Sequence, residues 1–195
     1  MSAATGLRLQ RTAGYTLLEI VIVMVMVATL VVIARTTLNA PRYRADSAIQ
    51  MFRNALTQAQ RTALLNQFDV IVVIDTVHQA LKVSEDANND GVIESDEHSL
   101  SYPLTDGVTF VVPPTGLDSA VSAAVVGSQL SSIGTLPMIA FGRDGAATSD
   151  LQLYIATPPH PGRVYRALRL VQSTGRSDWY LYNATANIWV EGGLR

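Results

Sequence analysis

The sequence contains no cysteine, so neither disulfide bonds nor thiolate chemistry is available to the protein. It has only three histidines, His78, His98 and His160, which are scattered along the chain. We find no nucleophile elbow, phosphate-binding loop or zinc-ligand spacing. These absences exclude the commonest catalytic arrangements, and we expect a protein that is not an enzyme.

Charged residues are also scarce, at 15% of the 195 residues, and the formal net charge is only −2. The two signs are nevertheless separated along the chain, because residues 1–61 are basic whereas residues 69–118 contain ten acidic residues and a single lysine. This pattern is typical of a membrane-proximal basic end followed by an exposed acidic region that can bind cations.

The longest apolar run, residues 15–34, has about twenty residues, which is the length that an α-helix needs to cross a hydrocarbon core of roughly 30 Å. No small-x-small cleavage site follows it, so we expect the segment to be retained rather than removed as a secretory signal. The chain is long enough for one ordinary domain besides this anchor. The sequence therefore predicts one membrane-spanning helix followed by one globular head.

One acidic residue, Glu19, lies near the start of this run, although an ionised group costs about 3 kcal/mol at the centre of a bilayer. The residues from Gly14 to Glu19, GYTLLE, resemble the processing motif of type IV pilins and type II secretion pseudopilins. The resemblance implies that a prepilin peptidase removes a leader, residues 1–14, by cutting between Gly14 and Tyr15, and then methylates the new amine of Tyr15. It also implies that Glu19 of one subunit pairs with this amine in its neighbour. The alternative is that Glu19 lies near the membrane interface and extends toward water.

The helical pattern continues beyond the apolar run. Apolar or small residues recur at spacings of four and three, at Ala45, Ile49, Phe52, Leu56, Ala59 and Ala63. We therefore predict one long helix from Tyr15 to about Asn66, with residues 15–34 as its transmembrane half and residues 35–66 as its amphipathic half. Pro41 is expected to bend this helix or to mark a local break.

Residues 67–195 are predicted to form a β-rich head. Runs with alternating apolar residues, bounded by turn residues, predict antiparallel strands at 69–75, 79–84, 107–112, 136–142, 151–156, 164–173, 178–183 and 187–191. Residues 114–135 are expected to form a long loop. The predicted fold class is α+β and type IV pilin-like, with a long N-terminal α-helix, membrane-spanning in its first half, packed on an antiparallel β-sheet head.

The head resembles the GspH/FimT family of minor pseudopilins and minor type IV pilins in three stretches. They are a D-x-N-x-D-G loop after the first hairpin, the run FGRDG at residues 141–145, and the run STGR at residues 173–176. The resemblance implies a single-pass protein of the bacterial inner membrane with a periplasmic head that joins a filament. The partners it implies are other pilin or pseudopilin subunits, the prepilin peptidase, the inner-membrane assembly platform and the lipid bilayer.

The acidic loop, residues 86–97 with sequence DANNDGVIESDE, fits the spacing of a calcium-binding loop. Calcium takes about six to eight oxygen ligands, and Gly91 permits the sharp turn that such a loop requires. The candidate ligands are the side chains of Asp86, Asn88, Asp90, Glu94 and Glu97 and the carbonyl oxygen of Val92. The alternative is a solvated hairpin loop, because Asp, Asn and Gly also favour tight turns. We expect no other cofactor.

Two functions remain open. The first is a minor pseudopilin of a type II secretion system, a structural subunit of the periplasmic pseudopilus that drives protein export. The second is a minor pilin of a type IV pilus that takes part in pilus assembly or DNA uptake, with Arg176 contacting DNA phosphates. Asp178 stands where the DNA-binding form of the family motif has a second arginine, which favours the secretion hypothesis.

Overall fold

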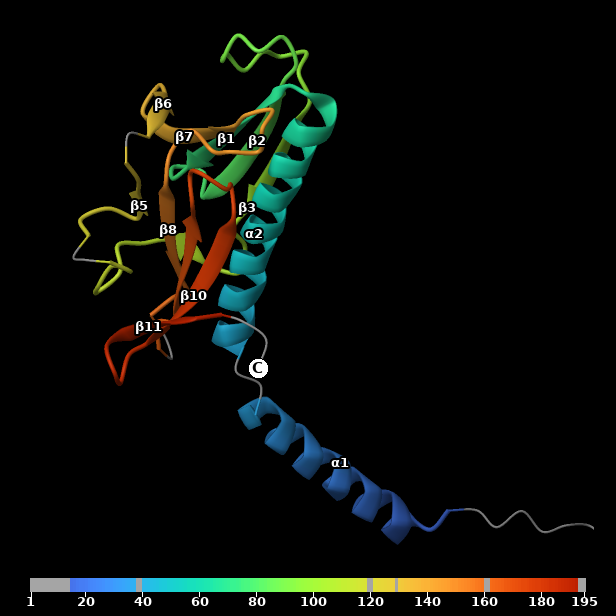
Figure 1. Ribbon diagram of the computed structural model, residues 1–195. Coiled ribbons are helices and arrows are strands. Elements are labelled where there is room, and N and C mark those ends of the chain that lie inside the picture. Colours follow the sequence, from blue (N-terminus) through green and yellow to red (C-terminus); the bar gives the residue numbers. More distant parts are fainter. Residues whose placement is uncertain (1–14, 38–39, 119–120, 129, 160–161, 193–195) are drawn as a thin grey trace, which may run out of the picture. The chain divides into compact units, whose positions relative to one another are not determined.

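The computed structural model describes residues 15–37, 40–118, 121–128, 130–159 and 162–192. The chain divides into two compact units, residues 1–39 and residues 40–195, which we describe separately. The first unit contains helix α1 (Leu17–Thr37), and the second contains helix α2 (Ala40–Asn66) and the β-strands (Figure 1). The predicted leader, including Gly14, lies outside the described residues.

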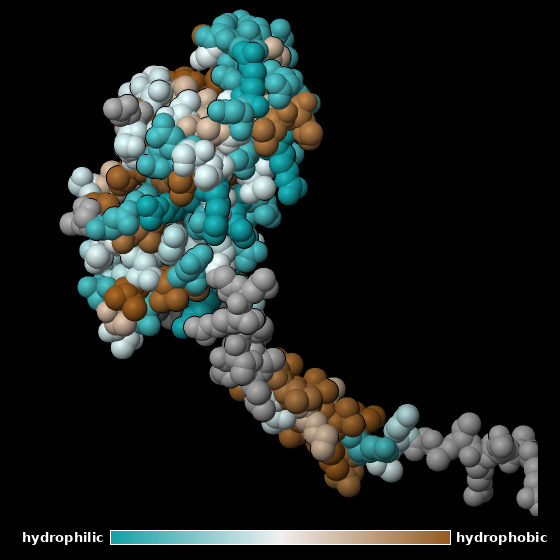
Figure 2. All heavy atoms as spheres, in the orientation of Figure 1, coloured by the Kyte–Doolittle hydropathy of each residue, from teal (hydrophilic) through white to brown (hydrophobic). Residues whose placement is uncertain are grey.

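Between Ile20 and Val32, helix α1 is uncharged and its apolar side chains face all sides. Its large apolar side chains between Leu17 and Val32 are 47–81% exposed, and Figure 2 shows them as an almost continuous hydrophobic surface. An amphipathic helix would instead confine such residues to one stripe that faces a core. The first unit therefore presents an apolar surface that needs a partner.

No helix in the described ranges is both long and apolar enough to cross a membrane. The predicted transmembrane half at residues 15–34 is therefore wrong, as is the prediction of a single-pass inner-membrane protein with a periplasmic head. The helix begins only at Leu17 and carries Glu19 in its first turn. The uncharged stretch that remains, residues 20–34, is about 22 Å long at 1.5 Å per residue, which is shorter than a hydrocarbon core of roughly 30 Å.

The predicted continuous helix from Tyr15 to Asn66 is also wrong, because α1 ends at Thr37 and α2 begins as a separate helix at Ala40. The predicted α+β, type IV pilin-like fold class, which depends on one long N-terminal helix, is wrong for the same reason: two separate helices accompany a chain that is mostly antiparallel β-sheet. Pro41 is the second residue of α2. In this first turn the backbone amides have no intrahelical acceptor, so a proline is tolerated. In the interior of one continuous helix, Pro41 would have removed a hydrogen bond and clashed with the preceding turn.

Two antiparallel sheets pack against α2. The first has the order β3-β2-β1-β7-β6 and consists of β1 (Asp69–Asp75), β2 (Ala80–Asp86), β3 (Ser99–Pro103), β6 (Ser131–Ile133) and β7 (Leu136–Phe141). The second has the order β11-β10-β9-β8-β4 and consists of β4 (Thr109–Phe110), β8 (Leu151–Ala156), β9 (Tyr165–Leu170), β10 (Ser177–Asn183) and β11 (Ile188–Glu191), while β5 (Val125–Val126) pairs with β8.

The core lies between α2 and the two sheets. The six helix residues that the sequence pattern identified are buried, and the ring of Phe52 stacks on Phe110 of β4 at a centroid distance of 5.7 Å. All buried apolar residues of the described chain fall between Ala45 and Leu170. Residues 40–195 therefore contain the whole described core, and we expect them to fold without α1.

One buried hydroxyl weakens this core. Ser149, between the buried residues Ala147 and Leu151, is only 1% exposed, and its Oγ has no hydrogen-bond partner within the described structure. Ser149→Ala is expected to raise the free energy of unfolding by about 1 kcal/mol, because it removes a desolvated polar group. Urea denaturation measures this. Ser84→Ala is the matched control and should lower stability, because the Ser84 hydroxyl bonds that of Ser99 at 2.6 Å. A less stable Ser149→Ala variant would contradict this explanation.

Candidate functional site

The start of α1 holds the residues of the predicted processing and assembly site. Tyr15 and Glu19 are described, whereas Gly14 is not. The backbone N–H of Glu19 donates to the hydroxyl of Thr16 at 3.2 Å, so Thr16 caps the helix and Glu19 is the third residue of its first turn. A carboxylate in the first turn also interacts favourably with the helix dipole. The sequence signal for this role, T-x-x-E before an apolar run, was missed in the sequence analysis.

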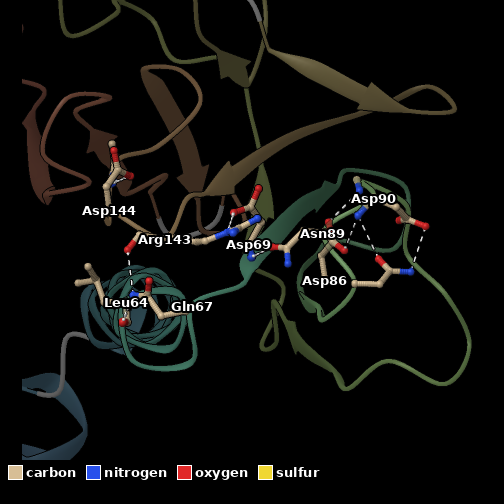
Figure 3. Close-up of polar contacts among 11 residues, drawn as sticks. Leu64, Gln67, Asp69, Asp86, Asn89, Asp90, Arg143 and Asp144 are labelled. Carbon is tan, nitrogen blue, oxygen red and sulfur yellow. Dashed lines mark hydrogen bonds and ion pairs between the residues drawn. The ribbon is translucent and has the colours of Figure 1, made fainter.

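The acidic loop is organised by its own hydrogen bonds. Asp86, the last residue of β2, is buried, and its carboxylate accepts the backbone N–H groups of Asp90 at 3.1 Å and Gly91 at 2.8 Å. At the other end, the carboxylate of Glu97 accepts the N–H groups of Ala87 and Glu94. These bonds close residues 86–97 into a compact turn. Figure 3 shows the Asp86–Asp90 half of it beside the start of β1.

Among the described residues, no three His, Asp or Glu side chains form a group that could hold a metal ion. Asn88 donates to Asp90 at 3.1 Å and to Glu94 at 3.2 Å, so two of the candidate ligand carboxylates are hydrogen-bonded within the loop. The neighbouring carboxylates repel, and Asp90 contributes most to raising the pKa of Glu94, followed by Asp96. Calcium binding by Asp86, Asn88, Asp90, Val92, Glu94 and Glu97 therefore stays a prediction, and it requires these oxygens to turn toward a common point.

The calcium prediction has a direct test. Calcium should raise the thermal unfolding midpoint of residues 40–195, and chelation should lower it, because a bound cation offsets the repulsion among these carboxylates. Glu94→Gln should reduce the effect, whereas Glu191→Gln, outside the loop, should leave it unchanged. An unfolding midpoint that is the same with calcium and with chelator would contradict the prediction.

Each of the three stretches that carry the family resemblance is hydrogen-bonded to α2 or to β1. The amide of Gln60 on α2 donates to the carbonyl oxygens of Gly145 at 2.7 Å and Thr174 at 2.8 Å, and so joins the FGRDG and STGR turns to the helix. The acidic loop is tied to β1, because Asn89 accepts the N–H of Asp69 at 2.8 Å. Arg143 approaches the same aspartate at 3.9 Å, as Figure 3 shows. These contacts hold the two turns against α2 and the acidic loop against β1.

We compared the chain with protein-family models, with curated proteins and with solved structures. None of them matches. The GspH/FimT resemblance therefore stays a prediction that depends on the motifs of the sequence.

Arg176, the candidate DNA contact, lies on the turn before β10. Its guanidinium pairs with the carboxylate of Asp178, with both Nε and Nη2 at 3.0 Å from the same oxygen. A phosphate would have to compete with this acid for the arginine. The arrangement does not favour the DNA hypothesis.

The most strongly perturbed acid of the head, Asp75, is the last residue of β1, and its carboxylate caps the turn that follows. Buried at the end of β1, it accepts the backbone N–H of His78 at 2.8 Å and the ammonium of Lys82 at 2.7 Å. The His78 N–H, followed by Lys82, lowers the pKa of Asp75 far below its ordinary value of 3.8. Sequence reasoning did not find this group, because its partners are set by the hairpin geometry.

A pH prediction follows for Asp75. Because its folded-state pKa is depressed, its stabilising contribution is fully present above about pH 4 and is lost as the pH falls from there toward the folded-state pKa. Asp75→Asn is expected to cost about 2 kcal/mol at neutral pH and progressively less in acid. Urea denaturation of both proteins across this range measures the difference. A difference that does not change with pH would contradict the assignment.

Proposed function

We propose that the protein is a structural subunit of a filament, a minor pseudopilin of a type II secretion system. The observation that carries the proposal is helix α1, whose apolar side chains are exposed on all sides. Burying one such side chain is worth about 1.5–3 kcal/mol, so the helix gains most when helices of neighbouring subunits enclose it. The folded head then remains available for contacts with other components of the machine.

Glu19 is consistent with this role. A carboxylate enclosed among apolar helices needs a cationic or hydrogen-bonding partner. Under the proposal, a prepilin peptidase cuts between Gly14 and Tyr15, and the freed amine of Tyr15 in the next subunit becomes that partner. Intact-mass analysis after co-expression with such a peptidase should find residues 1–14 removed and one methyl group added. Gly14→Val should keep the leader, and an unprocessed wild-type chain would contradict this step.

Deleting the gene in the organism that encodes the chain tests the function. We expect loss of export of the type II cargo, with recovery by the wild-type protein and by Glu191→Gln, but not by Glu19→Gln. The Glu191→Gln control removes an exposed carboxylate of the head and leaves α1 intact. Normal export with impaired pilus assembly or DNA uptake would instead support the minor-pilin function. A strain with neither defect would contradict a filament role.

A further inference from the structure

Strand β11 forms a free edge of the second sheet. Within the described residues it pairs only with β10, and the N–H of Gly192 continues that ladder by donating to the carbonyl of Trp179 at 2.8 Å. Hydrogen-bonded and non-bonded pairs alternate along an antiparallel ladder, so Trp189 and Glu191 direct their backbone groups away from β10. An edge with free backbone groups can pair with another strand.

Strand β11 carries two exposed apolar side chains. Ile188 is 53% exposed and Val190 is 40% exposed, and both lie on the sheet face that Leu181 shares, because Val190 is directly opposite Leu181. Free backbone groups and exposed apolar residues therefore occur together at one edge.

We propose that β11 pairs with β11 of a second copy of this chain, antiparallel about a two-fold axis at Val190. This register places Trp189 opposite the partner's Glu191, so that both residues with outward backbone groups are hydrogen-bonded. Val190 then meets its own copy in a non-bonded pair, in which side chains approach most closely.

The alternative symmetric registers are less favourable. An axis at Trp189 would place Glu191 opposite Asn187, whose φ of 54° is not that of a strand. An axis at Glu191 would place two carboxylates opposite each other. The register centred on Val190 avoids both conflicts.

The proposed register also gives the exposed Ile188 an apolar contact. With the axis at Val190, the partner's Ile188 lies opposite Gly192. A Cβ at Gly192 would overlap the indole ring of Trp179, so this ring occupies the place of the missing side chain. The partner's Ile188 therefore faces the indole ring across the paired strands.

This contact goes beyond the proposed filament role. A two-fold interface joins only two subunits, so it describes a dimer of heads that is separate from a filament in which all subunits point the same way. The paired strands have only four residues each, and the interface falls below the roughly 1,600 Å² of a standard stable complex. Association is therefore weak and appears only at high protein concentration.

Sedimentation equilibrium of residues 40–195 tests the proposal through charge. The wild-type head should dimerise, and Val190→Asp and Val190→Lys should each weaken association by at least about tenfold, because like charges then meet at the axis. An equimolar mixture of the two variants should associate again, because Asp then opposes Lys. Val112→Asp, at an apolar position that is 48% exposed outside β11, should dimerise like the wild type.

A backbone substitution tests the strand pairing itself. Glu191→Pro removes an outward N–H and leaves the bonds to β10 intact, so it should also weaken association by at least about tenfold. Circular dichroism confirms that each variant folds. A wild-type head that stays monomeric at millimolar concentration would overturn the proposal. So would a dimer that survives Val190→Asp and Glu191→Pro, or a mixture of charge variants that fails to associate.

Discussion

Gly175→Ala is expected to destabilise the head by about 3 kcal/mol, because two separate costs add at this position. Gly175 has a φ of +62°, a conformation that an L-residue adopts only with strain. A Cβ there would also overlap the Gly145 carbonyl oxygen and the Gln60 amide, the groups that join α2 to the FGRDG and STGR turns. Urea denaturation of residues 40–195 measures the loss.

Gly134→Ala provides the matched control, because Gly134 has a similar φ of +64° but no atom lies within 4 Å of the place where its Cβ would be. This variant should lose only the backbone term, about 1 kcal/mol. The difference between the two variants measures the close packing of Gln60 against the two turns. Equal losses of stability in Gly175→Ala and Gly134→Ala would contradict the close packing of Gln60 against the two turns.

Asp46→Ala is expected to cost about 3 kcal/mol, because it leaves a buried guanidinium without its anion. The Arg166 side chain on β9 is 3% exposed, and its Nε lies 2.6 Å from the Asp46 carboxylate on α2. The remaining bond from Arg166 to the carbonyl of Tyr165, at 2.8 Å, does not neutralise the charge.

A double-mutant cycle separates the charge from the packing. Arg166→Met keeps an unbranched apolar chain in the site, and Asp46→Ala combined with Arg166→Met should recover most of the stability lost in Asp46→Ala alone. Additive losses in the double variant would show that the two residues stabilise the fold independently.

Much of the sheet structure could be predicted from the sequence, because alternation of apolar residues is a local signal. The runs at 69–75 and 151–156 coincide with β1 and β8. Strand β3 was missed because its sequence, SLSYP, alternates weakly and ends in proline. Strands β5 and β6 were missed because they lie inside a segment rich in small and turn residues.

The helices show where local signals fail. Apolar content and length suggested a membrane span and one continuous helix. However, the position of Glu19 determines where the uncharged part of α1 begins, and the position of Pro41 determines where α2 starts. An average over a window conceals these positions. The amphipathic stripe of α2 was predicted correctly because its period depends on many residues at once.

The candidate site was predictable only in part. The acidic loop follows from spacing, but its internal hydrogen bonds depend on backbone turns that no motif specifies. Gln60 carries no sequence signal, because a glutamine on a helix is ordinarily solvated. Asp46 and Arg166 are 120 residues apart, and only the packing of β9 on α2 brings them together.

Photo-cross-linking from α1 in cells that assemble the whole system tests the central claim most directly. Benzoylphenylalanine in place of Val23, which is 53% exposed, should form adducts with the apolar N-terminal helices of other filament subunits, identified by mass spectrometry. The same probe in place of Val77, in the β1–β2 turn, should not reach those helices. Adducts at Val23 with such helices would support a filament role for α1, and adducts with none of them would contradict it.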